Sequence, residues 1–123
     1  MLSGLLIAMP MGAAEAVPVS VFLPRAEALV RRGPLALFSR DFYRLKAIIE
    51  ADGDRLKADY AEAKAAGKPS FFCPPARGKP RVGKSEYLAA LRAVPAGRRA
   101  STDTKDVLQR LLERKYPCPT TSL

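Results

Sequence analysis

The two cysteines, Cys73 and Cys118, constrain the fold of this chain more than any other feature, because they are its only cysteines among 123 residues. Each is followed by proline and has an aromatic residue within the two positions before it, Phe72 or Tyr116. Two helical patterns lie between the cysteines and are separated by Pro95. The sequence therefore predicts a helical hairpin whose two ends are joined by a Cys73–Cys118 disulfide.

A disulfide in this position would supply much of the stability of so small a chain. In the chain-entropy account, closing a loop of this length stabilises the fold by roughly 4 kcal/mol. Whole domains are stable by about 5–15 kcal/mol. Disulfides persist in oxidising compartments, so the pair predicts a periplasmic or secreted protein. The alternative is two unpaired buried thiols, which are typical of cytosolic proteins.

The first 16 residues have the pattern of a secretory signal sequence. An apolar run over residues 2–11 is followed by the small-x-small site Ala14-Glu15-Ala16. No lysine or arginine precedes the run, so either the true start lies upstream or the signal is atypical. The alternative is an apolar segment that packs on the domain. The run is too short to span a bilayer, and we expect no transmembrane segment.

The remaining sequence divides into a domain and a short tail. Residues 17–119 are predicted to form a single helical domain, within which residues 70–119 form the disulfide-closed module. Residues 120–123 are predicted to be a tail. The expected fold class is all-α, a small domain of about four helices.

Composition excludes several classes of function. Lysine and arginine number 21 against 12 aspartates and glutamates, which gives a net charge of +9. Histidine, the commonest general base and metal ligand, is absent, and two cysteines alone cannot build an ordinary zinc site. The carboxylates show no catalytic pairing, so we expect no enzyme, no metal and no cofactor. The scattered cations and the aromatic residues beside apolar ones argue against nucleic-acid binding.

The first predicted helix covers residues 20–32, with Ser20 as its N-cap and Gly33 as its end. Pro24 falls in or just after the first turn, so the helix can also begin later. Its apolar face carries Phe22, Ala26, Leu29 and Val30. The apolar linker that follows, with Leu35, Leu37 and Phe38, is expected to pack into the core.

A single long helix is predicted over residues 40–66, with Ser39 as its N-cap and Gly67 as its end. Its length would be about 40 Å. The apolar residues at helical spacing are Phe42, Leu45, Ile48, Ile49, Leu56 and Tyr60. Their phase is kept across Gly53, which favours one helix over two. The neighbouring carboxylates Asp52, Asp54 and Asp59 lack the remaining ligands of a calcium loop and are predicted to lie on the charged face.

Two shorter helices are predicted in the disulfide-closed module. The first covers residues 84–94 and would bury Tyr87, Leu88, Leu91 and Val94. The last is expected to begin at Ser101 or Thr102 as the N-cap, with Asp103 in its first turn. Its apolar stripe consists of Val107, Leu108, Leu111 and Leu112. Pro117 ends it, and Tyr116 is expected beside the disulfide.

The segment from Gly78 to Ser85 matches the letters of a phosphate-binding loop, G-x-x-x-x-G-K-S. That motif needs a preceding β-strand and a parallel sheet. A double proline precedes it here instead, so we predict an ordinary loop that leads into a helix.

Two cationic connectors are the predicted partner-binding segments. The loop over residues 76–81 carries Arg77, Lys79 and Arg81 but no apolar side chain, and the connector over residues 95–100 adds Arg98 and Arg99. Cationic loops on a firm base suit an acidic protein surface. Solvated loops without a partner are the equally weighted alternative.

The module resembles the C-terminal part of the Rap/Tai family of immunity proteins. The resemblance rests on the start Phe72-Cys73-Pro74-Pro75, on Tyr87, Leu88, Leu91, Pro95, Arg98, Val107 and Leu111, and on the end Tyr116-Pro117-Cys118. It covers residues 70–119 and implies the same Cys73–Cys118 pairing. A further family cysteine has no counterpart here, and the N-terminal half differs, so no toxin-inhibiting residue can be transferred.

The resemblance implies a small exported helical protein that neutralises a peptidoglycan amidase effector delivered by type VI secretion. The action would be by protein–protein contact. Some members of the family are dimers, so a homodimer is one expectation. The alternative function is a periplasmic chaperone or envelope stress protein with an unknown client.

Overall fold

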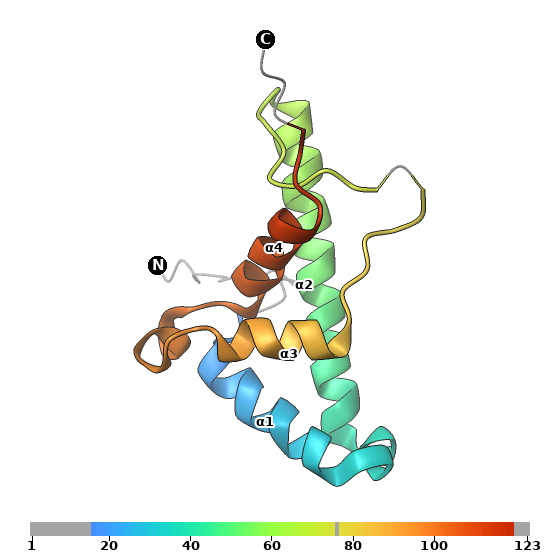
Figure 1. Ribbon diagram of the computed structural model, residues 1–123, viewed down its shortest axis with the longest axis vertical. Helices are drawn as coiled ribbons and strands as arrows, with labels where there is room; N and C mark the ends of the chain where they lie inside the picture. Colours follow the sequence, from blue (N-terminus) through green and yellow to red (C-terminus); the bar gives the residue numbers. More distant parts are fainter. Residues whose placement is uncertain (1–15, 76, 120–123) are drawn as a thin grey trace, which may run out of the picture.

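All regular structure in the described part of the chain, residues 16–75 and 77–119 of a computed structural model, is helical (Figure 1). The predicted all-α class with about four helices is confirmed. The elements are α1 (Val19–Arg32), the 3₁₀ helix η1 (Gly33–Phe38), α2 (Arg40–Ala65), α3 (Lys84–Arg92), the 3₁₀ helix η2 (Ala96–Ser101) and α4 (Thr104–Lys115). The predicted signal sequence, apart from Ala16, and the predicted tail lie outside the described residues.

Helix α2 runs along most of the molecule (Figure 1). It begins where the Ser39 hydroxyl accepts a hydrogen bond of 3.1 Å from the Phe42 amide, and Asp41 lies in its first turn. It ends before Gly67, whose φ of 70° lies in the left-handed region that favours glycine. One uninterrupted helix, its N-cap and its end are therefore as predicted.

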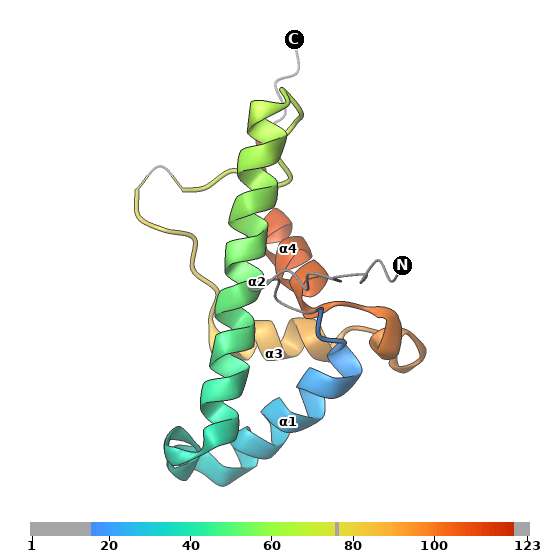
Figure 2. The same cartoon turned by 180° about the vertical axis from the view of Figure 1, so that it is seen from behind.

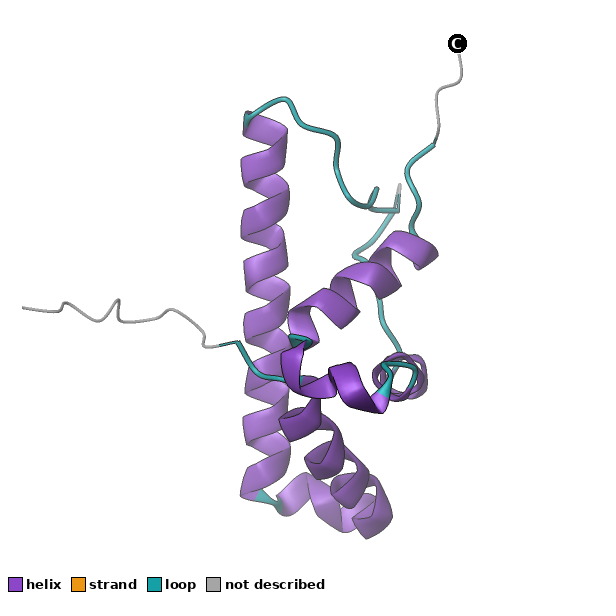
Figure 3. Cartoon of the chain, turned by 90° about the vertical axis from the view of Figure 1, so that its left-hand side faces the viewer, coloured by secondary structure: helices purple, strands orange, loops and turns teal. Residues whose placement is uncertain are grey.

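The helices form two layers. Seen from behind and from the side, α2 makes one layer, and α1, α3 and α4 lie together on one side of it (Figures 2 and 3). Helices α1 and α4 pack on α2, while α3 packs on α1 and α4. None of the described helices has the length and apolar character that crossing a membrane requires.

The core lies where the two layers meet. Its centre contains Val19, Phe22 and Leu91, and the edge of the Phe22 ring faces the Tyr87 ring at a centroid distance of 5.9 Å. The buried apolar residues of α4 are the four predicted ones, Val107, Leu108, Leu111 and Leu112. The same core extends toward the C-terminal end of α2, where the Tyr60 ring lies beside the rings of Phe71 and Phe72.

The segment before α1 is tied to the start of α4. The Val19 amide donates to the Thr102 carbonyl at 2.9 Å, and the Thr104 amide donates to the Val17 carbonyl at 3.0 Å. These two bonds join Pro18 and Asp103 in an isolated antiparallel bridge. Val17 therefore contacts α4 through the backbone.

Two predicted N-caps are wrong. Helix α1 begins at Val19, so Ser20 lies inside it, and Pro18 takes the extended N-cap conformation. Asp103 caps α4 in place of Ser101 or Thr102, because its carboxylate accepts a 2.9 Å hydrogen bond from the Lys105 amide. Both caps are set by the bridge between these segments, which joins residues distant in sequence.

The predicted packing of the apolar linker is also wrong. Leu35, Leu37 and Phe38 are 73%, 53% and 85% exposed, and only Ala36 of this segment is buried. The linker forms η1 at the turn between α1 and α2. Its small residue faces inward at the turn, so the large side chains project into solvent.

Candidate functional site

The disulfide module is held at the end of α4. Cys73 and Cys118 are bonded with their Cα atoms 4.8 Å apart, as predicted. The Cys73 amide also donates to the Tyr116 carbonyl at 2.9 Å. The covalent bond and the hydrogen bond together fix the start of the long loop that leads to α3.

The loop with Arg77, Lys79 and Arg81 projects away from the helices (Figures 1 and 2). All three side chains are exposed. The loop is anchored at Arg81, whose amide donates to the Tyr116 hydroxyl at 3.0 Å and whose carbonyl accepts from the Lys115 ammonium group. Both ends of the loop are therefore attached to the C-terminal end of α4.

A carboxylate joins this anchor to α3. Glu86 accepts hydrogen bonds from the Gly83 amide at 2.5 Å and from the Lys115 ammonium group at 2.7 Å. The hydrogen bond from Lys115, followed by that from Gly83, lowers the pKa of Glu86 below its ordinary value. The start of α3 is thereby fixed to the end of α4.

The letters of a phosphate-binding loop, from Gly78 to Ser85, fall on this loop and on the start of α3. Gly78 has a φ of 80°, and the helix that follows is only nine residues long. The described residues contain no strand that could precede such a loop. The segment is a loop that leads into a helix, as predicted.

Arg98 and Arg99 lie at the other end of α3 (Figure 1). The Arg99 guanidinium donates to the Val94 carbonyl at 2.9 Å and to the Arg92 carbonyl at 3.0 Å. These carbonyls are left free where α3 ends, so Arg99 serves to cap that helix. The two predicted cationic segments do not form one surface, and Arg99 has a structural role.

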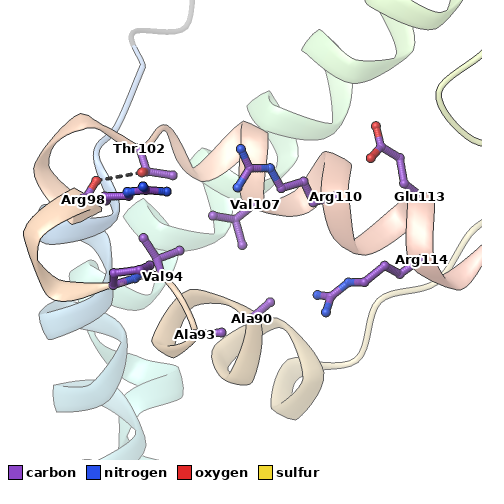
Figure 4. Close-up of a pocket in the computed structure, with 10 residues that line it drawn as sticks. Ala90, Ala93, Val94, Arg98, Thr102, Val107, Arg110, Glu113 and Arg114 are labelled. Carbon is purple, nitrogen blue, oxygen red and sulfur yellow. Dashed lines mark hydrogen bonds between the residues drawn. The ribbon is translucent and has the colours of Figure 1, made fainter.

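Arg98 instead borders an open groove between α3 and α4 (Figure 4). The groove has a volume of about 460 Å³. Its apolar part consists of Ala90, Ala93, Val94, Pro95 and Val107. Arg98, Arg110 and Arg114 lie along it, together with Glu113 and Thr102. This α3–α4 groove brings three cations to one apolar depression.

Arg110 and Arg114 were not among the predicted partner-binding residues. They lie one turn apart on α4, so their side chains share a face. That spacing, next to the buried stripe, was the available signal. The opposing wall from α3 is not visible in the sequence pattern.

A buried polar cluster joins α2 to the start of α4. Asp52 is 1% exposed, accepts a 2.7 Å hydrogen bond from the Thr104 hydroxyl and lies 2.5 Å from the Arg55 guanidinium. Arg55 also donates to both carboxylate oxygens of Asp103, at 3.1 and 3.2 Å. The prediction that Asp52 lies on the charged face of its helix is therefore wrong.

The pKa values in this cluster follow from its contacts. Partial burial raises the pKa of Asp103, but hydrogen bonds from Arg55 and from the Lys105 amide outweigh it, so the net pKa is below the ordinary value. Burial, followed by the charge of Asp52, raises the pKa of the Tyr87 phenol. Arg55 forms ion pairs with both carboxylates, and its single positive charge offsets one of their two negative charges. The Thr104 hydroxyl and the Lys105 amide supply further hydrogen bonds to the carboxylates.

The described residues contain no group of three His, Cys, Asp or Glu side chains arranged to hold a metal ion. No model of a known protein family matches this chain, and no curated protein or solved structure is similar enough to match it. The α3–α4 groove, which three arginines line, is the candidate site that we consider further.

Proposed function

We propose that this chain is an exported binding protein that holds an acidic segment of a protein partner in the α3–α4 groove. The observation that carries the proposal is the convergence of Arg98, Arg110 and Arg114 on one open depression with an apolar floor. The protein acts by contact and carries out no reaction of its own.

The chemistry of the groove fits such a ligand. A guanidinium group pairs with a carboxylate through two parallel hydrogen bonds, which is the geometry that an acidic side chain offers. The apolar floor supplies surface that a neighbouring side chain can cover. Both walls are helices that pack on the core, so little order has to be gained on binding.

Two features support export to the periplasm. The disulfide belongs to an oxidising compartment. The bridge to α4 uses Val17 to Val19, which directly follow the predicted cleavage site, so removal of the signal sequence would leave these bonds intact.

The resemblance to the Rap/Tai immunity proteins supplies the partner class. On that basis the partner is a peptidoglycan amidase effector, and binding neutralises it. Arg98 and Val107 are among the matching residues, and both line the groove.

The test is to measure inhibition and binding of a small exported peptidoglycan amidase by the purified, disulfide-bonded protein. We expect stoichiometric inhibition of peptidoglycan cleavage. The double variant Arg110→Ser/Arg114→Ser should bind about 10–100-fold more weakly, since the complex would lose a charged hydrogen bond for each arginine removed. The matched control is Lys57→Ser/Lys64→Ser, which removes two exposed cations from α2, outside the groove.

Equal binding by the groove variant and the control would overturn the groove as the contact surface. Failure to inhibit any such amidase, combined with weak binding to many unfolded proteins and suppression of their aggregation, would favour the envelope chaperone instead. A chaperone is expected to bind many clients weakly, whereas an immunity protein binds one folded enzyme tightly.

A further inference from the structure

The turn between α1 and α2 carries a surface that the proposed function does not use. We define the hairpin tip as residues 30–44, which comprise the last turn of α1, η1 and the first turns of α2. The tip lies at one end of the long axis of the molecule (Figures 1 and 3). Its exposed large apolar side chains are Val30, Leu35, Leu37, Phe38 and Tyr43. Isolated exposed apolar side chains are common, but five gathered at one end indicate an interaction site.

The apolar side chains of η1 are held in place. In a 3₁₀ helix, side chains three residues apart lie one above the other, so Leu35 and Phe38 project from the same side. Ala36, between them in sequence, is buried, and its carbonyl accepts a 2.8 Å hydrogen bond from the Ser39 hydroxyl. The same hydroxyl oxygen accepts the amide hydrogen of Phe42, so the turn is fixed to the start of α2. The tip is preorganised, which lowers the cost of ordering it on binding.

Cations surround the apolar side chains. The hairpin tip contains four arginines, Arg31, Arg32, Arg40 and Arg44, and one acidic residue, Asp41, which gives it a net charge of +3. All four arginines are exposed, and none forms an ion pair with another described residue. The tip therefore combines exposed apolar side chains with unneutralised positive charge on the turns of α1 and α2 that flank η1.

We infer that the hairpin tip binds the surface of a bilayer that contains anionic phospholipids. Apolar side chains enter the boundary between headgroups and acyl chains, while arginines behind them pair with lipid phosphates through long, flexible stems. Tyr43 suits the same boundary, because its ring is apolar and its hydroxyl group is polar. The described helices lie on the membrane and do not cross it.

Charge and shape favour a bilayer over the other occupants. A two-fold contact between two copies would bring the same arginines against each other, and like charges in an interface are unfavourable. A protein partner would have to wrap around the narrow end where α1 and α2 meet (Figures 1 and 3). A fluid bilayer accommodates a narrow apolar end and neutralises all four arginines at once.

The first experiment measures sedimentation of the purified protein with vesicles of phosphatidylcholine alone or of equal parts phosphatidylcholine and phosphatidylglycerol. We expect binding to the anionic vesicles at about 0.15 M salt, weakened by further salt. The variant Leu35→Ser/Phe38→Ser should lower partitioning about tenfold or more. The matched control Val21→Ser changes an exposed apolar residue near the opposite end of α1 and should bind like the unaltered protein.

The second experiment uses the absence of tryptophan from the chain. In Phe38→Trp, the single indole is expected to shift its fluorescence to shorter wavelength on addition of the anionic vesicles, whereas the indole of Val21→Trp should not respond. Absence of binding to anionic vesicles, or equal binding by the serine variants, would overturn the inference. So would sedimentation of the free protein as a dimer that Leu35→Ser/Phe38→Ser dissociates, because a second copy would then cover the tip.

Discussion

Asp52 shows how a single residue can depart from the pattern around it. Its neighbours Asp54 and Asp59 are accessible, but Asp52 lies on the same face of α2 as the buried Leu45 and Leu56. A buried carboxylate is tolerated only when it is paired and hydrogen-bonded, and Arg55 and Thr104 fulfil this condition. The residue therefore links α2 to α4.

Replacement of Asp52 by alanine should lower the free energy of unfolding by about 3 kcal/mol. The change leaves the buried Thr104 hydroxyl without its acceptor and removes one of the two carboxylates around Arg55. Urea denaturation measures the loss. Asp54→Ala, at an exposed position two residues away, should have almost no effect, and equal losses would contradict the assignment of Asp52 to the core.

Asp103 predicts a dependence of stability on pH. Its folded pKa lies below the ordinary value of 3.8, so its contribution is present above that pH and is lost as the pH falls through the folded pKa. We expect the free energy of unfolding to fall as the pH is lowered from the ordinary pKa of 3.8 through the lower folded pKa.

In Asp103→Asn the fall with pH should be shallower, because asparagine keeps an N-cap but cannot form the charged pair with Arg55. Urea unfolding at a series of pH values provides the comparison. If the free energy of unfolding depended on pH in the same way in both proteins, the pKa of Asp103 would not be lowered by folding.

At the scale of elements, α4 illustrates a helix whose packing follows from its periodicity. Leu111 is buried on the apolar stripe, whereas Gln109 lies half-buried beside it and hydrogen-bonds to Glu113 at 3.2 Å. Leu111→Ala should cost about 2–5 kcal/mol, as is usual for a buried leucine. Gln109→Ala should cost less than about 0.5 kcal/mol. Similar denaturation midpoints for the two variants would show that the helical phase is wrong.

The disulfide stabilises the next larger unit, from the loop to the end of α4. The variant Cys73→Ser/Cys118→Ser should lose about 2–4 kcal/mol, because the unfolded chain is no longer constrained. Thermal unfolding with and without reductant gives the same comparison in the unaltered protein. The unfolded, unreduced protein should contain no reactive thiols. Two reactive thiols per chain in that assay would show that Cys73 and Cys118 are not bonded.

For the whole molecule, the loop with Arg77, Lys79 and Arg81 leads into one end of α3, whereas the connector with Arg98 and Arg99 lies at the other end. The α3–α4 groove runs along the helix between them. The loop with Arg77, Lys79 and Arg81 is tethered away from the helices, whereas the α3–α4 groove is formed between two packed walls. Exposed loop charges outside the contact mainly affect the rate of encounter, whereas groove charges that a bound partner would cover mainly affect the rate of dissociation.

Replacement of Arg77, Lys79 and Arg81 together by serine should slow association with the acidic partner several-fold at low salt. The effect should shrink at high salt, and the dissociation rate should be unchanged. Arg110→Ser/Arg114→Ser should instead speed dissociation and leave the association rate nearly unchanged. Surface plasmon resonance at two salt concentrations separates the rates, and an unchanged association rate for the loop variant at low salt would exclude a steering role.

The sequence by itself was sufficient for the features that depend on neighbouring residues. The Ser39 cap, the unbroken α2, the stop at Gly67 and the α4 stripe follow from local hydrogen bonding and helical spacing. The cysteine pairing followed because only one pair exists. These features can be predicted without knowing which helix faces pack against each other.

Only the tertiary structure decided which residues are covered and by what. The Asp103 cap depends on the bridge to Pro18, and the groove depends on α3 lying beside α4. Burial of Asp52 and exposure of Phe38 both run against hydrophobicity, because burial depends on the packing of distant segments. Helical periodicity gives the direction of a side chain but not the distance to its partner, so the site residues on α4 became recognisable only once α3 was in place.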